Sequence, residues 1–198
     1  MGLGDELIVT GLARRMQRRN AAPVRVLDQR GRPRWSPVWE NNPRFAALGY
    51  RGKVQTLVNA PGQRDYIAGQ RLEGWVWREW VCPLGEIYLT DEERTVGSRY
   101  AGRILLEPAL KPEASPNKDW GWDRWCALSE HLQSKGYPVS QFASQHCPPL
   151  PGAEIIKTTS FRQACAVLER ARLAILPEGG LHHAAAAFGT AAIVIFGG

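Results

Sequence analysis

The chain has 198 residues, of which 44% are hydrophobic and 22% charged, a composition typical of a globular protein with a hydrophobic core. Its formal charge of +6 suits an anionic partner (a nucleotide, a phosphorylated lipid, a membrane surface or nucleic acid) without choosing among them. No run approaches the roughly 18 apolar residues of a membrane-spanning helix. The first residues lack the pattern of a signal peptide, so we expect a cytoplasmic protein.

Cysteine spacing argues against a structural metal or a disulfide framework. The four cysteines are far apart in the sequence and form no Cys-x-x-Cys pair: Cys82, Cys126, Cys147 and Cys165. We therefore expect free thiols, no metal site and no cofactor.

The chain opens with Gly2-Leu3-Gly4-Asp5, which leads directly into a helical pattern. Apolar residues recur at i, i+3, i+4 and i+7, namely Val9, Leu12, Ala13 and Met16. Asp5 lies at the positive end of the helix dipole, where a carboxylate is stabilised in its ionised form. Two interpretations of Asp5 stay open, a helix-capping carboxylate without chemistry and a group that faces a substrate.

The rest of the N-terminal half contains short elements. Val24–Leu27 and Val54–Val58 are predicted strands, and Arg64–Leu72 is a predicted helix. Three aromatic residues follow, Trp75, Trp77 and Trp80. Their neighbours carry mixed charges rather than a dense basic patch, so core or interdomain packing is favoured over base stacking.

The second half alternates strands with helices, which predicts a parallel sheet. Ile87–Leu89 resembles a strand, and Thr90 with Glu93 forms a capping box that begins a helix. The elements expected after Gly102 are a strand at Arg103–Leu106, a helix at Trp122–Lys135, a strand at Val139–Phe142 and a helix from Ser160 to Arg170.

The stretch from Arg172 to Phe196 predicts a strand, a glycine turn, an alanine-rich helix and another strand. The strands are Leu173–Leu176 and Ala191–Phe196, and the turn is Pro177–Gly180. Ligands of parallel α/β sheets bind where strands end and helices begin, and here Glu178 and His183 are nearby. The alternative is that the glycines form only a turn and the histidines line a surface helix.

Four segments together resemble glycosyltransferase family 9, the heptosyltransferase type. They are Gly2–Asp5, Ile87–Arg94, the Asn117–Trp120 segment with Trp125–Leu128, and Glu178–Ala186, which is similar to a D-[ST]-G-x-x-H-x-A-A pattern. The family implies an α/β GT-B architecture, with two Rossmann-like domains facing a cleft. We expect an acceptor-side domain over residues 1–98 and a nucleotide-sugar domain over residues 99–198. The first domain is expected to be reduced, without its first strand, and the second to be cut after its last strand, as in a fragment or a compact relative.

The resemblance implies an inverting transfer of a heptose-like sugar from a nucleotide-diphosphate donor (ADP-heptose by analogy) to a saccharide or lipopolysaccharide-type acceptor. It also implies possible contact with an anionic inner membrane. Asp5 would be the general base. The substrate-binding residues would be Gly4, Lys118, Glu178, Gly179, Gly180 and His183.

Two departures from the family pattern motivate an alternative. Glu178 replaces the family's aspartate, and Gly179 replaces its serine or threonine. His182 is an additional imidazole. Because adjacent helix residues point about 100° apart, we expect His183 in the site and His182 in an exposed or capping position. The alternative is a degenerate protein that binds a nucleotide without transfer. A nucleic-acid-associated protein ranks last.

Overall fold

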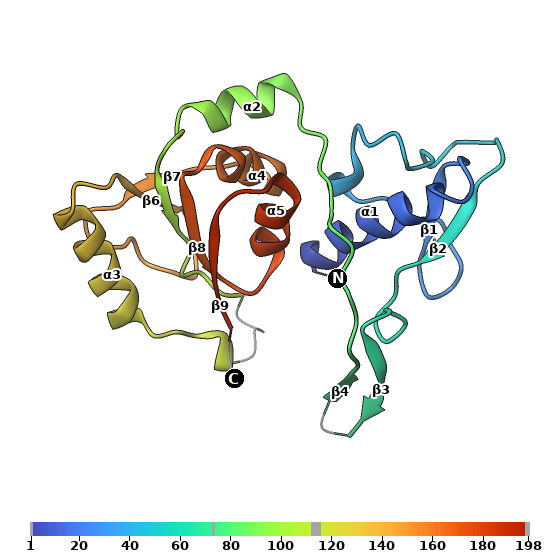
Figure 1. The fold of residues 1–198 in the computed structure, drawn as a ribbon, viewed down its shortest axis with the longest axis horizontal. Helices are drawn as coiled ribbons and strands as arrows, with labels where there is room; N and C mark the ends of the chain where they lie inside the picture. Colours follow the sequence, from blue (N-terminus) through green and yellow to red (C-terminus); the bar gives the residue numbers. More distant parts are fainter. Residues whose placement is uncertain (1, 73, 112–115, 197–198) are drawn as a thin grey trace. The chain divides into compact units, whose positions relative to one another are not determined.

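The computed structural model describes residues 2–72, 74–111 and 116–196 (Figure 1). Its internal contacts define two units, Met1–Tyr88 and Leu89–Gly198, which are described separately below. The division precedes the domain boundary expected between residues 98 and 99. The reason is that helix α2, Asp91–Ser98, packs against α4, Phe161–Arg170, in the C-terminal unit.

The N-terminal unit is built around α1 and a small parallel sheet. Its elements are α1 (Leu3–Gln17), β1 (Val24–Leu27), the 3₁₀ helix η1 (Pro37–Trp39) and β2 (Gln55–Val58). The expected helix and both expected strands are confirmed. Trp39 is fully buried, and its indole N–H donates to the Glu6 carbonyl over 3.0 Å. This bond ties α1 to η1.

A hairpin replaces the helix predicted over Arg64–Leu72, so that prediction is wrong. β3 (Ile67–Arg71) pairs antiparallel with β4 (Gly74–Trp77). Gly74 has a φ of +141°, a value that favours glycine, and it starts the returning strand. Strand β4 follows β3 almost directly in the sequence. Hydrogen bonding between these two strands therefore outweighs the helical pattern of the segment.

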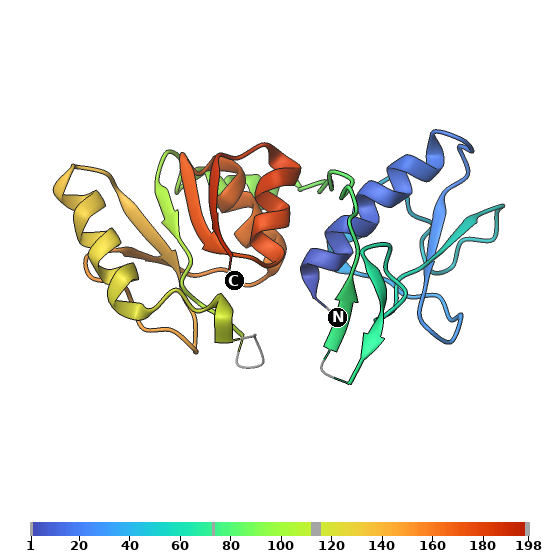
Figure 2. The same ribbon diagram turned by 60° about the horizontal axis from the view of Figure 1, so that its bottom comes forward.

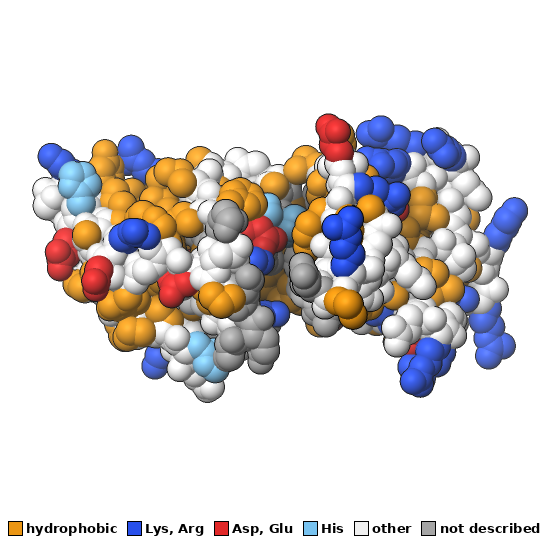
Figure 3. Space-filling model, turned by 90° about the horizontal axis from the view of Figure 1, so that it is seen from below, with side chains coloured by type: hydrophobic (Ala, Val, Ile, Leu, Met, Phe, Trp, Pro, Cys, Tyr) orange, Lys and Arg blue, Asp and Glu red, His pale blue; other side chains and the backbone are white. Residues whose placement is uncertain are grey.

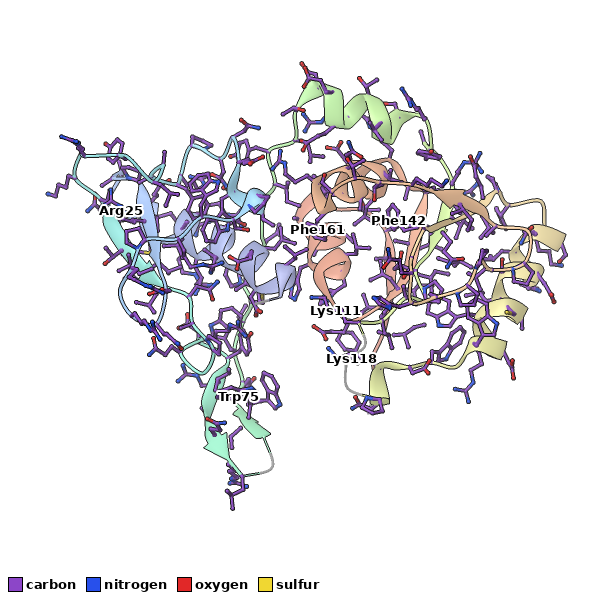
Figure 4. All side chains as sticks on the ribbon, turned by 180° about the vertical axis from the view of Figure 1, so that it is seen from behind. Arg25, Trp75, Lys111, Lys118, Phe142 and Phe161 are labelled. Carbon is purple, nitrogen blue, oxygen red and sulfur yellow. The ribbon has the colours of Figure 1, made fainter. Side chains whose placement is uncertain are left out.

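The hairpin carries two of the three tryptophans for which core or interdomain packing was expected. Trp75 is 38% exposed and Trp77 is 64% exposed, so neither lies in a core. Trp77 stacks on Tyr66, with ring centroids 5.6 Å apart. Figure 4 shows Trp75 on the hairpin. The strand expected at Ile87–Leu89 is also absent, because this described segment runs without a pairing strand.

The C-terminal unit contains a five-stranded parallel sheet, which confirms the expected sheet type. Its strands are β5 (Ile104–Leu106), β6 (Val139–Phe142), β7 (Glu154–Ile156), β8 (Leu173–Pro177) and β9 (Ala192–Ile195). They lie in the order β7-β6-β5-β8-β9, and every neighbouring pair is parallel. The short strand β7 was not expected from the sequence.

Helices cover both faces of this sheet. The two views of the ribbon show α3 (Trp122–Ser134) on one side, and α4 and α5 (Gly180–Phe188) on the other (Figure 2). Beneath α3, Trp125 packs in a cluster of buried apolar residues: Ile104, Leu106, Val139, Leu150 and Ile175. Adjacent residues of a strand point to opposite faces of the sheet. The neighbours of Leu106 and Ile175 on the other face are also buried, namely Leu105 and Leu176. Both faces are thus apolar, as parallel strands require.

Helix α2 is fixed to α4 by a close backbone approach and a buried ion pair. A Cβ atom added to Gly97 would lie 2.2 Å from the Ala166 carbonyl oxygen, so this contact requires glycine. Arg162, with a side chain 4% exposed, binds both carboxylate oxygens of Glu93 over 2.6 and 2.7 Å. The expected capping box is confirmed by reciprocal bonds between Thr90 and Glu93.

The two units differ in charge. Residues 1–88 hold 14 Lys and Arg against 8 Asp and Glu, a net charge of +6, whereas residues 89–198 hold 11 of each. Figure 3 shows Lys and Arg side chains gathered over the N-terminal unit. Within the described ranges, no helix combines the length and apolarity needed to cross a membrane.

Candidate functional site

The strand order of the C-terminal unit reverses between β5 and β8. From β5 the chain proceeds to β6 and β7 on one side, then crosses to β8 and β9 on the other. Ligands of open α/β sheets bind at such a switch point, outside the carboxyl ends of the strands. Glu107 directly follows β5 and Glu178 directly follows β8. Both carboxyl groups therefore come from the strand ends that border this switch point.

Lys118 and Glu178, two of the expected site residues, form an ion pair. Lys118 ends the short 3₁₀ helix η2, Pro116–Lys118, while Glu178 links β8 to α5, so the fold joins segments 60 residues apart. About a third of each side chain is exposed (34% and 31%). Figure 4 shows Lys118 beyond the ends of the strands. The ammonium group and the carboxylate are both accessible to a ligand.

Gly179 precedes α5, and neither its conformation nor its packing requires glycine. Its φ of 169° is extended, and a Cβ atom added there would meet nothing within 4 Å. Space is therefore open beside the first N–H groups of α5, where anions bind to helix termini. Gly180 begins the helix, one residue earlier than expected.

The two histidines lie closer together than helical spacing predicted. The ring centroids of His182 and His183 are 4.1 Å apart, with 33° between the planes. His182 accepts a hydrogen bond from the Gly179 N–H over 3.4 Å, so its expected capping role is confirmed. Burial lowers the pKa of His182, although nearby Glu178 acts in the opposite direction. A lowered pKa favours the neutral imidazole at pH 7.

Sequence reasoning missed Glu107. This residue is 8% exposed, and burial raises the pKa of its carboxyl group to about 8. Oε1 accepts from the Ala109 N–H over 3.2 Å, while Oε2 has no hydrogen-bond partner within the described ranges. The signal was present in the sequence, since Glu107 is an acidic residue at the end of the apolar run Ile104–Leu106.

Asp5 lies in the N-terminal unit, where two side chains hold its carboxylate. The Tyr66 hydroxyl donates to Oδ1 over 2.5 Å, and the Arg64 guanidinium lies 3.0 Å from Oδ2. Burial and the hydrogen bond to Asp5 raise the pKa of Tyr66 to about 12, so the phenol stays protonated. These three residues and Trp80 border a cavity of about 60 Å³.

The capping interpretation of Asp5 lacks support. The N-cap of α1 is Gly2, and the helix has no side-chain cap within the described residues. Gly4 is buried in the first turn of α1. Sequence reasoning assigned no role to Arg64 or Tyr66, because both are more than 55 residues from Asp5 and the segment between 64 and 72 was expected to be helical.

Comparison with known proteins identifies the class of the C-terminal unit. Residues 103–198, just under half of the chain, match the model of glycosyltransferase family 9 (heptosyltransferase). No curated protein sequence matches significantly. The structure of a family 9 glycosyltransferase from Veillonella parvula has a TM-score of 0.68 at 14% identity, covering 100% of this chain and 79% of that protein.

Two further structures match more weakly. E. coli ADP-heptose lipopolysaccharide heptosyltransferase II has a TM-score of 0.45 at 16% identity, over 60% of this chain and 41% of that one. The iron-containing dodecameric glycosyltransferase TibC from enterotoxigenic E. coli has a TM-score of 0.43 at 20% identity, over 58% and 30%.

The family match confirms the resemblance indicated by the motifs. Residues 103–198 match the model of glycosyltransferase family 9, and the α/β fold with a parallel sheet is similar to that of a solved family member.

Proposed function

We propose that the protein is an inverting glycosyltransferase that moves a heptose-like sugar from a nucleotide-diphosphate donor, by analogy ADP-heptose, to a saccharide or lipopolysaccharide-type acceptor. The observation that carries the proposal is the Lys118–Glu178 pair beside the start of α5, within the family 9 domain. Lysine serves phosphate groups as a point charge, and helix N-termini bind anions.

In the donor site, Lys118 contacts the diphosphate, and the backbone at Gly179 and Gly180 approaches it closely, with the Gly180 N–H as donor. A side chain at Gly179 would project into this open space, so glycine keeps the approach clear. Glu178 holds the lysine in place through the ion pair. His183, in the same helical turn, borders the nucleotide sugar. As the sugar leaves, the ammonium and the N–H groups stabilise the charge that develops on the diphosphate.

Asp5 is the general base that accepts the proton of the acceptor hydroxyl. A base must reach the proton and be fixed in orientation. Arg64 and Tyr66 supply the orientation, since each binds one carboxylate oxygen. The cavity beside Asp5 admits a group as small as a hydroxyl. Gly4, in the first turn of α1 beside Asp5, is the substrate-binding residue of this unit in the proposal.

Peripheral contact with an anionic membrane belongs to the same proposal. The net charge of +6 lies in residues 1–88, and the hairpin of this unit exposes apolar side chains. Leu72 at its tip is fully exposed, and Trp77 is 64% exposed. Basic surfaces are attracted to anionic lipids, and tryptophan favours the membrane–water interface.

Donor binding and sugar transfer test the proposal together. We expect ADP and nucleotide-diphosphate sugars to raise the melting temperature, and Lys118→Ala to abolish the shift. The matched control is Lys135→Ala, an exposed lysine at the far end of α3. A nucleotide shift that Lys118→Ala leaves unchanged would contradict the donor site. Binding without hydrolysis or transfer to any saccharide acceptor would instead support a degenerate nucleotide-binding protein.

A further inference from the structure

The start of α5 brings together three side chains that can bind a metal ion. One ligand atom from each of Glu178, His182 and His183 lies within 4.8 Å of the others, and all three side chains are half-buried. We propose that this cluster binds one divalent transition-metal ion of the Zn²⁺ or Co²⁺ type. All three ligands belong to the C-terminal unit, and two of them, Glu178 and His183, are also part of the proposed donor site.

The ligand types determine which ions fit. Imidazole nitrogens suit zinc, cobalt, nickel and copper, whereas magnesium and calcium prefer oxygen ligands. Two imidazoles and one carboxylate form a three-ligand set that leaves further positions for water or a ligand oxygen. The imidazole must be neutral to bind.

The arrangement is close to the required geometry. Bonds of about 2.0–2.1 Å place the ligand atoms of a tetrahedral zinc ion roughly 3.3 Å apart. The present spread of up to 4.8 Å must shorten on binding, and we expect rotation of the half-buried side chains to supply this movement. The 4.1 Å separation of the two rings already places both imidazoles on one side of the helix start.

Two positive groups oppose a cation here. One is the N-terminal end of α5, and the other is the Lys118 ammonium, which contacts Glu178 Oε2. Oε1 is the oxygen left for a metal ion. Lys118 and the metal thus compete for one carboxylate, and removing the lysine charge should strengthen metal binding. A cluster without metal affinity would not respond in this way.

Titration of the untagged 198-residue chain with Co²⁺ tests the proposal without nucleotide. We expect one ion per chain, with visible absorption bands and no near-ultraviolet thiolate band. His182→Ala and Glu178→Gln should each weaken binding at least roughly tenfold, because each removes one ligand. His131→Ala, which removes an exposed histidine from α3, and Cys82→Ser, which removes an exposed thiol, should leave binding unchanged.

Lys118→Met gives the most discriminating result. We expect this variant to bind Co²⁺ more tightly than the unaltered chain, because it removes the charge that competes for Glu178. Zn²⁺ should displace Co²⁺, whereas excess Mg²⁺ should not. Circular dichroism identifies any variant that fails to fold. If His182→Ala does not fold, the test uses Glu178→Gln, because glutamine has nearly the same shape as glutamate. The proposal is overturned if Co²⁺ does not bind stoichiometrically, or if His182→Ala binds as the unaltered chain does. Nucleotide thermal shifts in the absence of metal measure the proposed donor site separately, so failure of one proposal is distinguished from failure of the other.

Discussion

The two units hold their carboxylates in different ways. In the cationic N-terminal unit, a guanidinium and a phenol bind the two oxygens of Asp5. In the charge-balanced C-terminal unit, Glu178 pairs with Lys118, whereas buried Glu107 has no cationic partner among the residues that the structure describes. The net charge of the chain therefore says little about the proposed donor site, because that charge belongs to the other unit. Local partners decide what each carboxylate can do.

The largest expected effect concerns Asp5. We expect Asp5→Asn to lower the rate of sugar transfer by roughly 10²–10⁴-fold, the range for loss of a general base, with donor binding unchanged. Steady-state kinetics and nucleotide thermal shifts measure the two effects. Glu79→Gln, at an exposed position of the same unit, is the control. Full activity in Asp5→Asn would remove Asp5 from the mechanism.

Tyr66→Phe refines this comparison, because it removes one of the two groups that hold Asp5. We expect a smaller loss in kcat than for Asp5→Asn, with little change in KM, since the carboxylate remains but is less well oriented. Equal losses in both variants would indicate that Tyr66 itself contacts the reacting atoms. An unchanged kcat would show that Arg64 alone suffices.

Next in size is the buried pair in the C-terminal unit. Glu93→Gln leaves the Arg162 guanidinium buried beside a neutral group, and we expect a loss of roughly 3–5 kcal/mol in the free energy of unfolding by urea. Exposed Glu92→Gln is the control. Burial acts to raise the pKa of Glu93, but Arg162 and the Thr90 N–H lower it overall. Its contribution is therefore present above the unfolded pKa of about 4.5 and is lost as the pH falls through the lower folded pKa.

Glu107 should show the opposite pH dependence. Its folded pKa of about 8 lies above the unfolded value of 4.5, so the folded state favours the neutral carboxyl group. The stability from this group is complete below about pH 4.5 and is lost as the pH rises toward 8. Glu107→Gln mimics the neutral form, and we expect it to flatten this dependence. Urea midpoints at about pH 6 and about pH 9 compare the two proteins, and an unchanged slope would contradict the assignment.

The smallest effect is expected at the hairpin. Leu72→Ser with Trp77→Ser should reduce co-sedimentation with vesicles of anionic lipid by a few fold, because apolar contact adds to electrostatic attraction. Leu48→Ser, at another exposed apolar residue of the N-terminal unit, is the control. Equal loss in the control would show that the hairpin has no special part in membrane contact.

Sequence patterns predicted most of the C-terminal unit, because β5 and β8 are short apolar runs that are each followed by a loop and a helix. The capping box at Thr90 and the family pattern at Glu178 also predicted local structure correctly. The hairpin was missed because the segment before Leu72 has no strict alternation, and its strand forms through pairing with β4. The Lys118–Glu178 and Asp5–Tyr66 contacts join distant segments, so no local pattern encodes them.

The packing of α2 determines where the C-terminal unit can be cut from the chain. A fragment that starts at residue 99 would lack Glu93, which leaves Arg162 without its carboxylate, and it would expose the surface of α4 that Gly97 covers. A fragment that starts at Leu89 keeps the helix, its capping box and both contacts. The longer fragment is therefore the one to express for nucleotide- and metal-binding experiments on this unit alone.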